Sequence, residues 1–395
     1  MASEIVSGQR VTRSASVYVH FPYCLSKCPY CDFVSHASRP DEIDSRRYSD
    51  AIIEELDRRS ASFHDRSIGS IFFGGGTPSL WLPSELGRVL RAIHSTFGTS
   101  IETEVTVECN PSSLDESRAS ALVNVGVNRL SVGAQSFRDD HLRYLGRRHD
   151  GNGARQALFA AMRSGIPRIS ADFIFGLPGQ SPDDAQRQAI ELSDFGVTHL
   201  SCYQLTIEPG TRFGDLARRG SLTLADDGEV AESFLAVDEG LTSRGLRHYE
   251  VSNYAREGDQ CRHNLGYWRG DEYLGLGCGA VGYARTNAFG DPVTGVRWRN
   301  TDSPRDYLQR AASDDTELLD AETLLRERIM LGLRVDSGVD LDDAASELGV
   351  VGWTSARSSC AAALVKRGRI VRQGSRIHIP KREWLWTDRI AADLI

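Results

Sequence analysis

Three cysteines lie within eight residues near the start of the chain, in the stretch HFPYCLSKCPYCDF. Cys24, Cys28 and Cys31 have the spacing C-x3-C-x2-C, and no fourth cysteine follows at close range. Thiolates are soft ligands that suit zinc and iron–sulfur clusters. A structural zinc site needs four ligands, whereas a 4Fe–4S cluster on three cysteines keeps one iron open for a small molecule. The spacing favours the cluster, and a zinc site completed by His20 or His36 is the alternative.

Two further motifs offer groups that suit an anion or a hydroxyl. The segment GGGTP, residues 74–78, has three residues without a Cβ, so its backbone can approach a ligand closely and offer N–H groups. A tight turn between strand and helix is the alternative there. Glu108 ends another apolar run, where its carboxylate is suited to accept hydrogen bonds from ribose hydroxyls or an ammonium. An isolated glutamate is otherwise solvated or paired with a cation.

The elements that position these residues alternate regularly along residues 17–205. Short apolar runs rich in β-branched residues end in glycine or a polar residue, and an amphipathic helical stretch follows. This alternation predicts a parallel sheet with right-handed crossovers. Six such units favour an α/β fold with a partial parallel (β/α)6 barrel over an open sheet. The runs are VYVHF, SIFFGGG, TEVTVECN, RLSVGAQ, ISADFIFG and HLSCYQL.

Candidate functional groups fall at corresponding places in these units. The cysteines follow the first run, the glycines of GGGTP close the second, Glu108 closes the third and Gln135 the fourth, and Asp172 lies within the fifth. In barrels of parallel strands, active groups gather at the carboxyl ends of the strands. We therefore expect one site at that end.

Composition and length set the remaining expectations. The chain has 395 residues and a net charge of −8, and no apolar run approaches the ~20 residues of a membrane helix. The N-terminus lacks the apolar core of a signal peptide, which predicts a cytoplasmic protein without a membrane span. The negative balance argues against nucleic acid as a partner, although the C-terminal region is locally basic.

Four regions are expected along the chain. They are a polar tail (1–16), the barrel (17–225), an irregular extension (226–315) and a small helical domain (316–395). The last region predicts a winged-helix-like domain, with helices followed by a hairpin that turns at Gly374. Gly277, Gly279 and Gly282 fit a dinucleotide fingerprint, but no helix opens after them, so we interpret them as close backbone packing.

Taken together, the motifs resemble the radical S-adenosylmethionine (SAM) superfamily, specifically its coproporphyrinogen-dehydrogenase branch. The resemblance rests on YVHFPYCLSKCPYCDF, FFGGGTPSL, VECNP, GAQSF, LGRRH and ADFIFGLPGQ, and covers about residues 17–285. It implies a 4Fe–4S cluster on Cys24, Cys28 and Cys31, with SAM chelating the open iron. Such proteins can cleave SAM reductively to methionine and a 5′-deoxyadenosyl radical. The implied SAM contacts are Tyr18, Tyr30, Gly75, Gly76, Thr77, Glu108, Gln135, Arg147 and Asp172.

One departure from the oxidase pattern changes the expected function. The coproporphyrinogen oxidases of this branch read C-x3-C-x2-C-x-C, and Phe33 stands here at the last cysteine position. SCYQLTIEPGT, YEVSNYA and CRHNLGYW resemble instead the HemW family of haem chaperones. That resemblance implies haem as a cargo for haem-requiring acceptor proteins, membrane-bound ones included. It makes His263 the expected iron ligand, with Tyr267 and Trp268 stacking on the porphyrin.

Two alternatives stay open at this point. His263 and Asn264 can instead hydrogen-bond a loop, with the neighbouring aromatic rings packed beneath it. The whole chain can also be an oxygen-independent coproporphyrinogen III dehydrogenase, which removes carbon dioxide from two propionates by radical chemistry.

Overall fold

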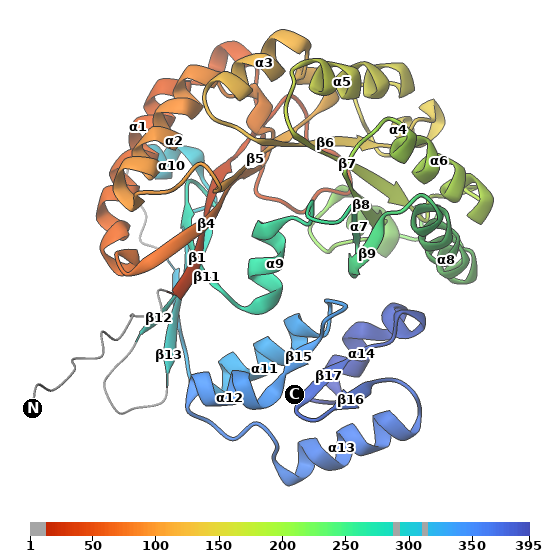
Figure 1. Cartoon of the computed structure of the whole chain (residues 1–395). Helices are drawn as coiled ribbons and strands as arrows, with labels where there is room; N and C mark the ends of the chain where they lie inside the picture. Colours follow the sequence, from red (N-terminus) through yellow and green to blue (C-terminus); the bar gives the residue numbers. More distant parts are fainter. Residues whose placement is uncertain (1–12, 287–292, 310–314) are drawn as a thin grey trace, which may run out of the picture.

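Among the described residues, twelve strands form one mixed sheet, and six of them make the curved parallel wall of a barrel (Figure 1). The computed structural model describes residues 13–286, 293–309 and 315–395. The six neighbours pair in parallel throughout and coincide with the six apolar runs. The predicted partial parallel barrel is therefore confirmed. Its strands are β1 (Arg13–Phe21), β4 (Arg66–Gly75), β5 (Glu104–Cys109), β6 (Arg129–Gln135), β7 (Arg168–Phe175) and β8 (His199–Gln204).

Helices between these strands cover the outer face of the sheet (Figure 1). They begin where the sequence offers caps: the Ser181 side chain accepts a hydrogen bond from the Asp184 backbone N–H, and Pro182 occupies the first turn. The helices of the barrel are α1 (Ser45–Arg59), α2 (Pro83–Phe97), α3 (Glu116–Asn124), α4 (Asp139–Tyr144), α5 (Gly151–Arg163), α6 (Pro182–Asp194), α7 (Arg212–Arg218) and α8 (Asp227–Ser243).

The strands alternate apolar and polar residues, and the two kinds face opposite sides. On β5, Val105 and Val107 are buried in the main apolar core beneath the helices. The alternate residues of the same strand, Thr106 and Glu108, line the cavity inside the barrel. The inner face of this barrel is therefore polar and partly open, unlike a barrel filled by aliphatic side chains.

The sheet extends beyond the barrel at both ends, in regions where the sequence predicted irregular structure. β11 pairs in parallel with β1, and three further strands continue antiparallel from it. At the other end β10 pairs antiparallel with β8, and β9 with β10. The added strands are β9 (Arg247–Glu250), β10 (Asn253–Ala255), β11 (Glu272–Leu276), β12 (Val281–Thr286), β13 (Thr294–Arg299) and β14 (Asp315–Leu319).

Two expectations from the sequence meet the structure in this part of the sheet. β1 begins at Arg13, so the end of the predicted polar tail is strand, and residues 1–12 lie outside the described part. Gly277 and Gly282, which fit the dinucleotide fingerprint, lie in close packing contacts, as the sequence predicted. A Cβ on Gly277 would lie 2.4 Å from the His20 carbonyl oxygen, and one on Gly282 would lie 2.0 Å from the Trp298 ring.

A separate apolar core holds the small C-terminal domain together. Its predicted hairpin is present, with β16 (Val371–Gln373) and β17 (Arg376–His378) on either side of Gly374. The remaining elements are β15 (Val339–Asp340), α11 (Ala321–Gly332), α12 (Leu341–Leu348), α13 (Ser355–Lys366) and α14 (Thr387–Ala392), and in the barrel β2 (Tyr23–Cys24), β3 (His36–Ala37) and α10 (Pro304–Gln309). Within the described ranges, none of the helices is long and apolar enough for a membrane crossing.

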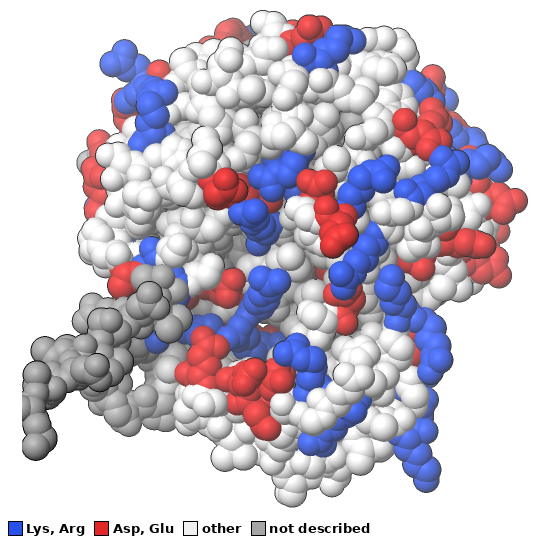
Figure 2. Space-filling model, in the orientation of Figure 1, with Lys and Arg blue, Asp and Glu red and all other residues white. Residues whose placement is uncertain are grey.

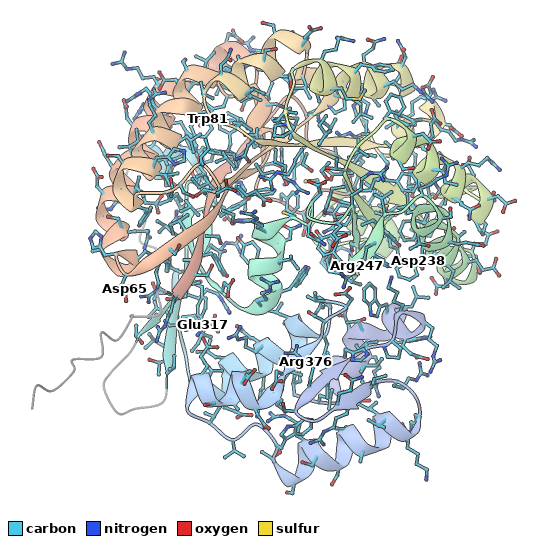
Figure 3. The ribbon with its side chains drawn as sticks, in the orientation of Figure 1. Asp65, Trp81, Asp238, Arg247, Glu317 and Arg376 are labelled. Carbon is cyan, nitrogen blue, oxygen red and sulfur yellow. The ribbon has the colours of Figure 1, made fainter. Side chains whose placement is uncertain are left out.

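The helix α9 (Arg262–Arg269) lies between the barrel and the C-terminal domain, in contact with β4 and α11 (Figure 1). The seam beside it is closed by backbone bonds, including one from Val251 N–H to the Arg334 carbonyl. Arg247, labelled in Figure 3, forms an ion pair with Asp336 across the seam. On the face shown in Figure 2, acidic and basic side chains are interspersed over the barrel and the C-terminal domain.

Candidate functional site

The barrel encloses a cavity of about 540 Å³, which is within the size range of small-molecule sites. Residues of all six parallel strands, of the cysteine loop and of α9 line it. Every residue predicted to hold the cluster or SAM is among them, and so is the predicted iron ligand His263. These residues are Tyr18, Cys24, Cys28, Tyr30, Cys31, Gly75, Gly76, Thr77, Glu108, Gln135, Arg147, Asp172 and His263.

Cys24 ends β2, Cys28 and Cys31 lie in the loop between β2 and β3, and all three carry free thiols. Thr77 Oγ1 donates to Cys24 Sγ at 3.3 Å, and Arg147 Nη1 donates to Cys28 Sγ at 3.6 Å. Burial raises the pKa of the Cys24 and Cys31 thiols, so a hydroxyl donor, a guanidinium or bound metal is needed to favour the thiolates. The loop therefore presents three sulfur ligands with two of their supporting donors already in place.

The histidines of the zinc alternative are engaged elsewhere. His20 Nε2 lies 2.8 Å from the Val34 carbonyl oxygen, and its Nδ1 lies 3.0 Å from the Tyr18 hydroxyl. His36 Nε2 bonds the Asp302 carbonyl oxygen at 2.9 Å. In the described ranges no three His, Cys, Asp or Glu side chains are grouped closely enough to hold one metal ion. The donor set fits a cluster that takes one thiolate per iron better than a single zinc ion.

The glycines of GGGTP have a different role from the one expected. Gly75 N–H donates to Glu108 Oε2 at 3.1 Å, and Gly76 N–H donates to the Phe21 carbonyl at 2.7 Å. These two groups are thus not free to bind an anion, which corrects that expectation. The glycines are needed because β1 and β4 approach closely. Gly75 has a φ of +105°, and an added Cβ would lie 2.4 Å from the His20 ring.

Gln135 and Arg147 bring unsatisfied polar atoms to the cysteine end of the cavity. Gln135 has a φ of +65°, a strained conformation for a residue with a side chain. Its Oε1 is buried without a hydrogen-bond partner, and so is Arg147 Nε, although Arg147 Nη2 donates to the Gly133 carbonyl at 2.9 Å. Buried polar groups in native proteins usually have partners. These two atoms therefore fit a polar ligand such as SAM next to the cysteine loop.

Two carboxyl groups, Glu108 and Asp172, face the middle of the cavity. Burial and the neighbouring Asp172 charge raise the pKa of Glu108 to about 8. Burial also raises the pKa of Asp172, which accepts a hydrogen bond from Ser131 Oγ at 3.1 Å. Near neutral pH, Glu108 is then mainly protonated, and a cationic ligand would be needed to ionise it.

The raised pKa of Glu108 predicts a stability that falls with pH. The folded state holds this proton up to about pH 8, whereas the unfolded chain releases it near 4.5. The contribution is fully present below about 4.5 and is lost as the pH rises through about 8, with a slope of up to about 1.4 kcal/mol per pH unit. Urea unfolding of the wild type and Glu108→Gln across this range measures it. Parallel curves for the two proteins would contradict the prediction.

His263 faces the cavity from the first turn of α9. Its Nδ1 lies 3.1 Å from Ser70 Oγ, and its Nε2 is buried without a partner. The imidazole stacks on Phe72 with ring centroids 4.8 Å apart and meets the edge of Tyr267 at 5.0 Å. Burial lowers the pKa of His263 to about 3, so the ring is neutral and able to bind a metal at neutral pH. The side-chain partner of His263 is thus Ser70 on β4 and, within the described part of the chain, not a loop residue.

The other aromatic residues of HNLGYW divide between two sides of α9. Tyr267 lines the barrel cavity, as expected for a residue near a porphyrin. Trp268 does not, and its ring lies 5.8 Å from the Arg334 guanidinium of the C-terminal domain. The expectation that Trp268 stacks on a ligand in this cavity is therefore wrong.

Sequence reasoning missed Glu104, which anchors the start of α9. This fully buried carboxylate accepts hydrogen bonds from the backbone N–H groups of Arg262 and His263, at 3.3 and 3.2 Å. Arg168 Nη1 also donates to it, at 3.1 Å. The available signal was an acidic residue at the start of an otherwise buried strand in TEVTVECN. Because it bonds two consecutive N–H groups of α9, Glu104 sets the position of His263.

Comparison with known proteins agrees with this arrangement. Residues 18–188 match the radical SAM superfamily, and residues 319–386 match the HemN C-terminal domain. A Haemophilus influenzae protein described as heme chaperone HemW is 40% identical over 301 residues, covering 74% of this chain and 76% of its own. A Mycobacterium tuberculosis protein of the same description is 32% identical over 96% of this chain and 94% of its own.

The solved structure of Escherichia coli coproporphyrinogen III oxidase, HemN, is similar in fold. It superposes with a TM-score of 0.79 over 97% of this chain and 90% of its own, at 20% identity. The radical SAM superfamily implies a 4Fe–4S cluster and SAM, and the three thiols and orphaned polar atoms of the cavity fit both. The extent and identity of the matches show that the chain belongs to the HemW family of radical SAM proteins.

Proposed function

We propose that this protein is a haem chaperone, which binds haem inside the barrel and passes it to haem-requiring proteins, including membrane-bound respiratory ones. The name shared by its relatives supports haem as the cargo. In this proposal Cys24, Cys28 and Cys31 hold the cluster. SAM lies between the cluster and the carboxyl groups of Glu108 and Asp172 in the barrel cavity, which we call the lumen. The free cysteines suit a reducing compartment, so we place this activity in the cytoplasm.

The unpartnered Nε2 of His263 is the observation that carries the proposal. A neutral imidazole nitrogen is a good ligand for haem iron, and a hydrogen bond at the other nitrogen fixes the ring's orientation. Ser70 supplies that bond here. Phe72, Tyr18 and Tyr267 surround the ring with aromatic faces against which a porphyrin can pack.

The proposed SAM contacts follow from groups with unused hydrogen-bonding capacity. When bound, the cluster and SAM supply one-electron chemistry. The chain's own residues bind and orient them: Thr77 and Arg147 donate to cysteine sulfurs, and Gln135 Oε1 awaits a donor. Glu108 is suited to bind a ribose hydroxyl or an ammonium, and a cation there would shift its proton equilibrium.

An anaerobic haem titration of the cluster-loaded protein tests the function. We expect the wild type to keep a Soret band through gel filtration, and His263→Ala to bind haem at least about tenfold more weakly because the iron loses its ligand. His64→Ala, at an exposed histidine, is the matched control and should behave like the wild type. Wild-type protein that keeps no haem, but forms a vinyl product from coproporphyrinogen III, would replace the proposal with the dehydrogenase.

A further inference from the structure

We propose that Arg129 and Thr106 form a carboxylate-binding subsite at the floor of the lumen, which receives a propionate of the haem cargo. The floor is the end of the lumen at the amino ends of the strands, opposite the cysteine loop. Arg129 is the first residue of β6, whereas Gln135, its last, lies at the cysteine end. This inference rests on the proposed function, because it names the part of the cargo that the floor recognises.

Two buried polar atoms at the floor lack partners. Arg129 is 1% exposed, and its Nη1 donates to the Asp259 carbonyl at 2.9 Å, but its Nη2 has no partner. Thr106 is also 1% exposed, and its Oγ1 has no partner. The two residues are paired across neighbouring strands, and both line the barrel cavity. Because unpaired buried donors are costly, a guanidinium N–H and a hydroxyl side by side favour an acceptor bound between them.

The charge balance at the floor favours an anion. Arg129 and Arg168 both form ion pairs there with the same carboxylate, Glu104. Two guanidinium groups therefore share one carboxylate. Higher in the lumen, Glu108 and Asp172 are acidic groups with raised pKa values and offer a carboxylate no cation. The Arg129 guanidinium at the floor does offer one, through its unpartnered Nη2.

The floor is also within reach of a haem bound at His263. His263 is held by Ser70 on β4, and β4, β5 and β6 are consecutive neighbours in the sheet. Two strand spacings, about 10 Å, separate β4 from the strand that carries Arg129. In the register, Phe72, on which the His263 ring stacks, pairs with Thr106, and Thr106 pairs with Arg129, so these groups lie at similar heights in the barrel. This separation is on the scale of a porphyrin with its propionate arm.

The test compares haem with haem dimethyl ester, in which both propionates are esterified, on the full-length, cluster-loaded protein under anaerobic conditions. We expect the ester to bind the wild type roughly tenfold more weakly, because it loses a hydrogen bond to a charged donor. Thr106→Val should weaken haem binding about threefold or more but leave ester binding nearly unchanged. In Arg129→Lys, which keeps a cation beside Glu104, the difference between the two compounds should shrink.

Thr198→Val is the matched control for the threonine variant. Its hydroxyl is likewise buried without a partner, but Thr198 does not line the cavity. Thr106→Val breaks no hydrogen bond, so it should fold as stably as the control. Equal affinity of the wild type for haem and its ester would overturn the subsite and leave the chaperone function intact. If the wild type retained neither haem nor the ester, both the subsite and the chaperone function would be overturned. A loss of SAM affinity in Thr106→Val, with haem binding unchanged, would assign the floor to SAM and overturn the inference.

Discussion

Replacing Cys28 by serine is expected to remove bound iron and sulfide almost completely. The cysteine cluster offers three thiols, and a 4Fe–4S cluster held by only two of them would have a second iron without a protein ligand, besides the open one. Cys28 is the thiol that faces the Arg147 guanidinium, at 3.6 Å. A serine hydroxyl fits the space, but it is a harder ligand and ionises far less readily than a thiol.

Iron and acid-labile sulfide, measured after anaerobic reconstitution, are the readouts, together with the visible absorbance of the cluster. Cys360→Ser is the matched control, since Cys360 bonds the Asp393 carbonyl in the C-terminal domain, outside the cavity. It should keep the wild-type content. A Cys28→Ser protein that still binds four irons would refute the cluster assignment. Tight binding of a single zinc ion by the wild type would revive the zinc alternative.

The barrel and the convergence of its site were predictable because both depend on short-range patterns. Each parallel strand is marked by an apolar run, and its carboxyl end by a polar or glycine residue. Once the strands are parallel, those ends meet at one edge, which brings Glu108, Gln135 and Asp172 into one cavity with the three cysteines. The polar lining of the lumen also follows from a local pattern, because polar residues alternate with apolar ones along each strand.

The features that escaped prediction depend on contacts between distant parts of the chain. The strands β9–β14 are short and are stabilised by neighbours far away in sequence, so their local pattern was weak. The place of α9 is set by Glu104, about 160 residues earlier, and by the C-terminal domain. Trp268 was expected at a ligand because of its motif, but the helix turns it toward Arg334. Periodicity within α9 alone could not identify which face meets the lumen.

The N–H groups of GGGTP illustrate a second limit. Glycine indicates that the backbone approaches something closely, but the sequence does not say whether that is a ligand or a neighbouring strand. Here the neighbour is β1, whose Phe21 carbonyl accepts from Gly76 N–H. The same segment still borders the site through Thr77, whose hydroxyl donates to Cys24 Sγ.

Replacing Glu104 by glutamine is expected to lower both stability and haem binding. The carboxylate is fully buried, pairs with Arg129 and Arg168 and accepts two N–H groups of α9. Glutamine keeps the size but removes the charge. The guanidinium groups of Arg129 and Arg168 then lose the carboxylate with which they pair. Breaking a buried ion pair in this way costs about 3–5 kcal/mol of unfolding free energy.

The same substitution should act on haem through the position of α9. Glutamine can accept the N–H bonds of Arg262 and His263 through only one oxygen, so the turn that carries His263 is held less firmly. We expect haem affinity to fall about three- to tenfold at a temperature where the variant is still folded. Glu102→Gln, at an exposed glutamate two residues earlier, should change neither quantity. Urea unfolding and haem titration of the two variants separate the effects. A stable Glu104→Gln protein with unchanged haem affinity would show that α9 is positioned by its contacts with β4 and α11 instead, because those are the other elements it packs against.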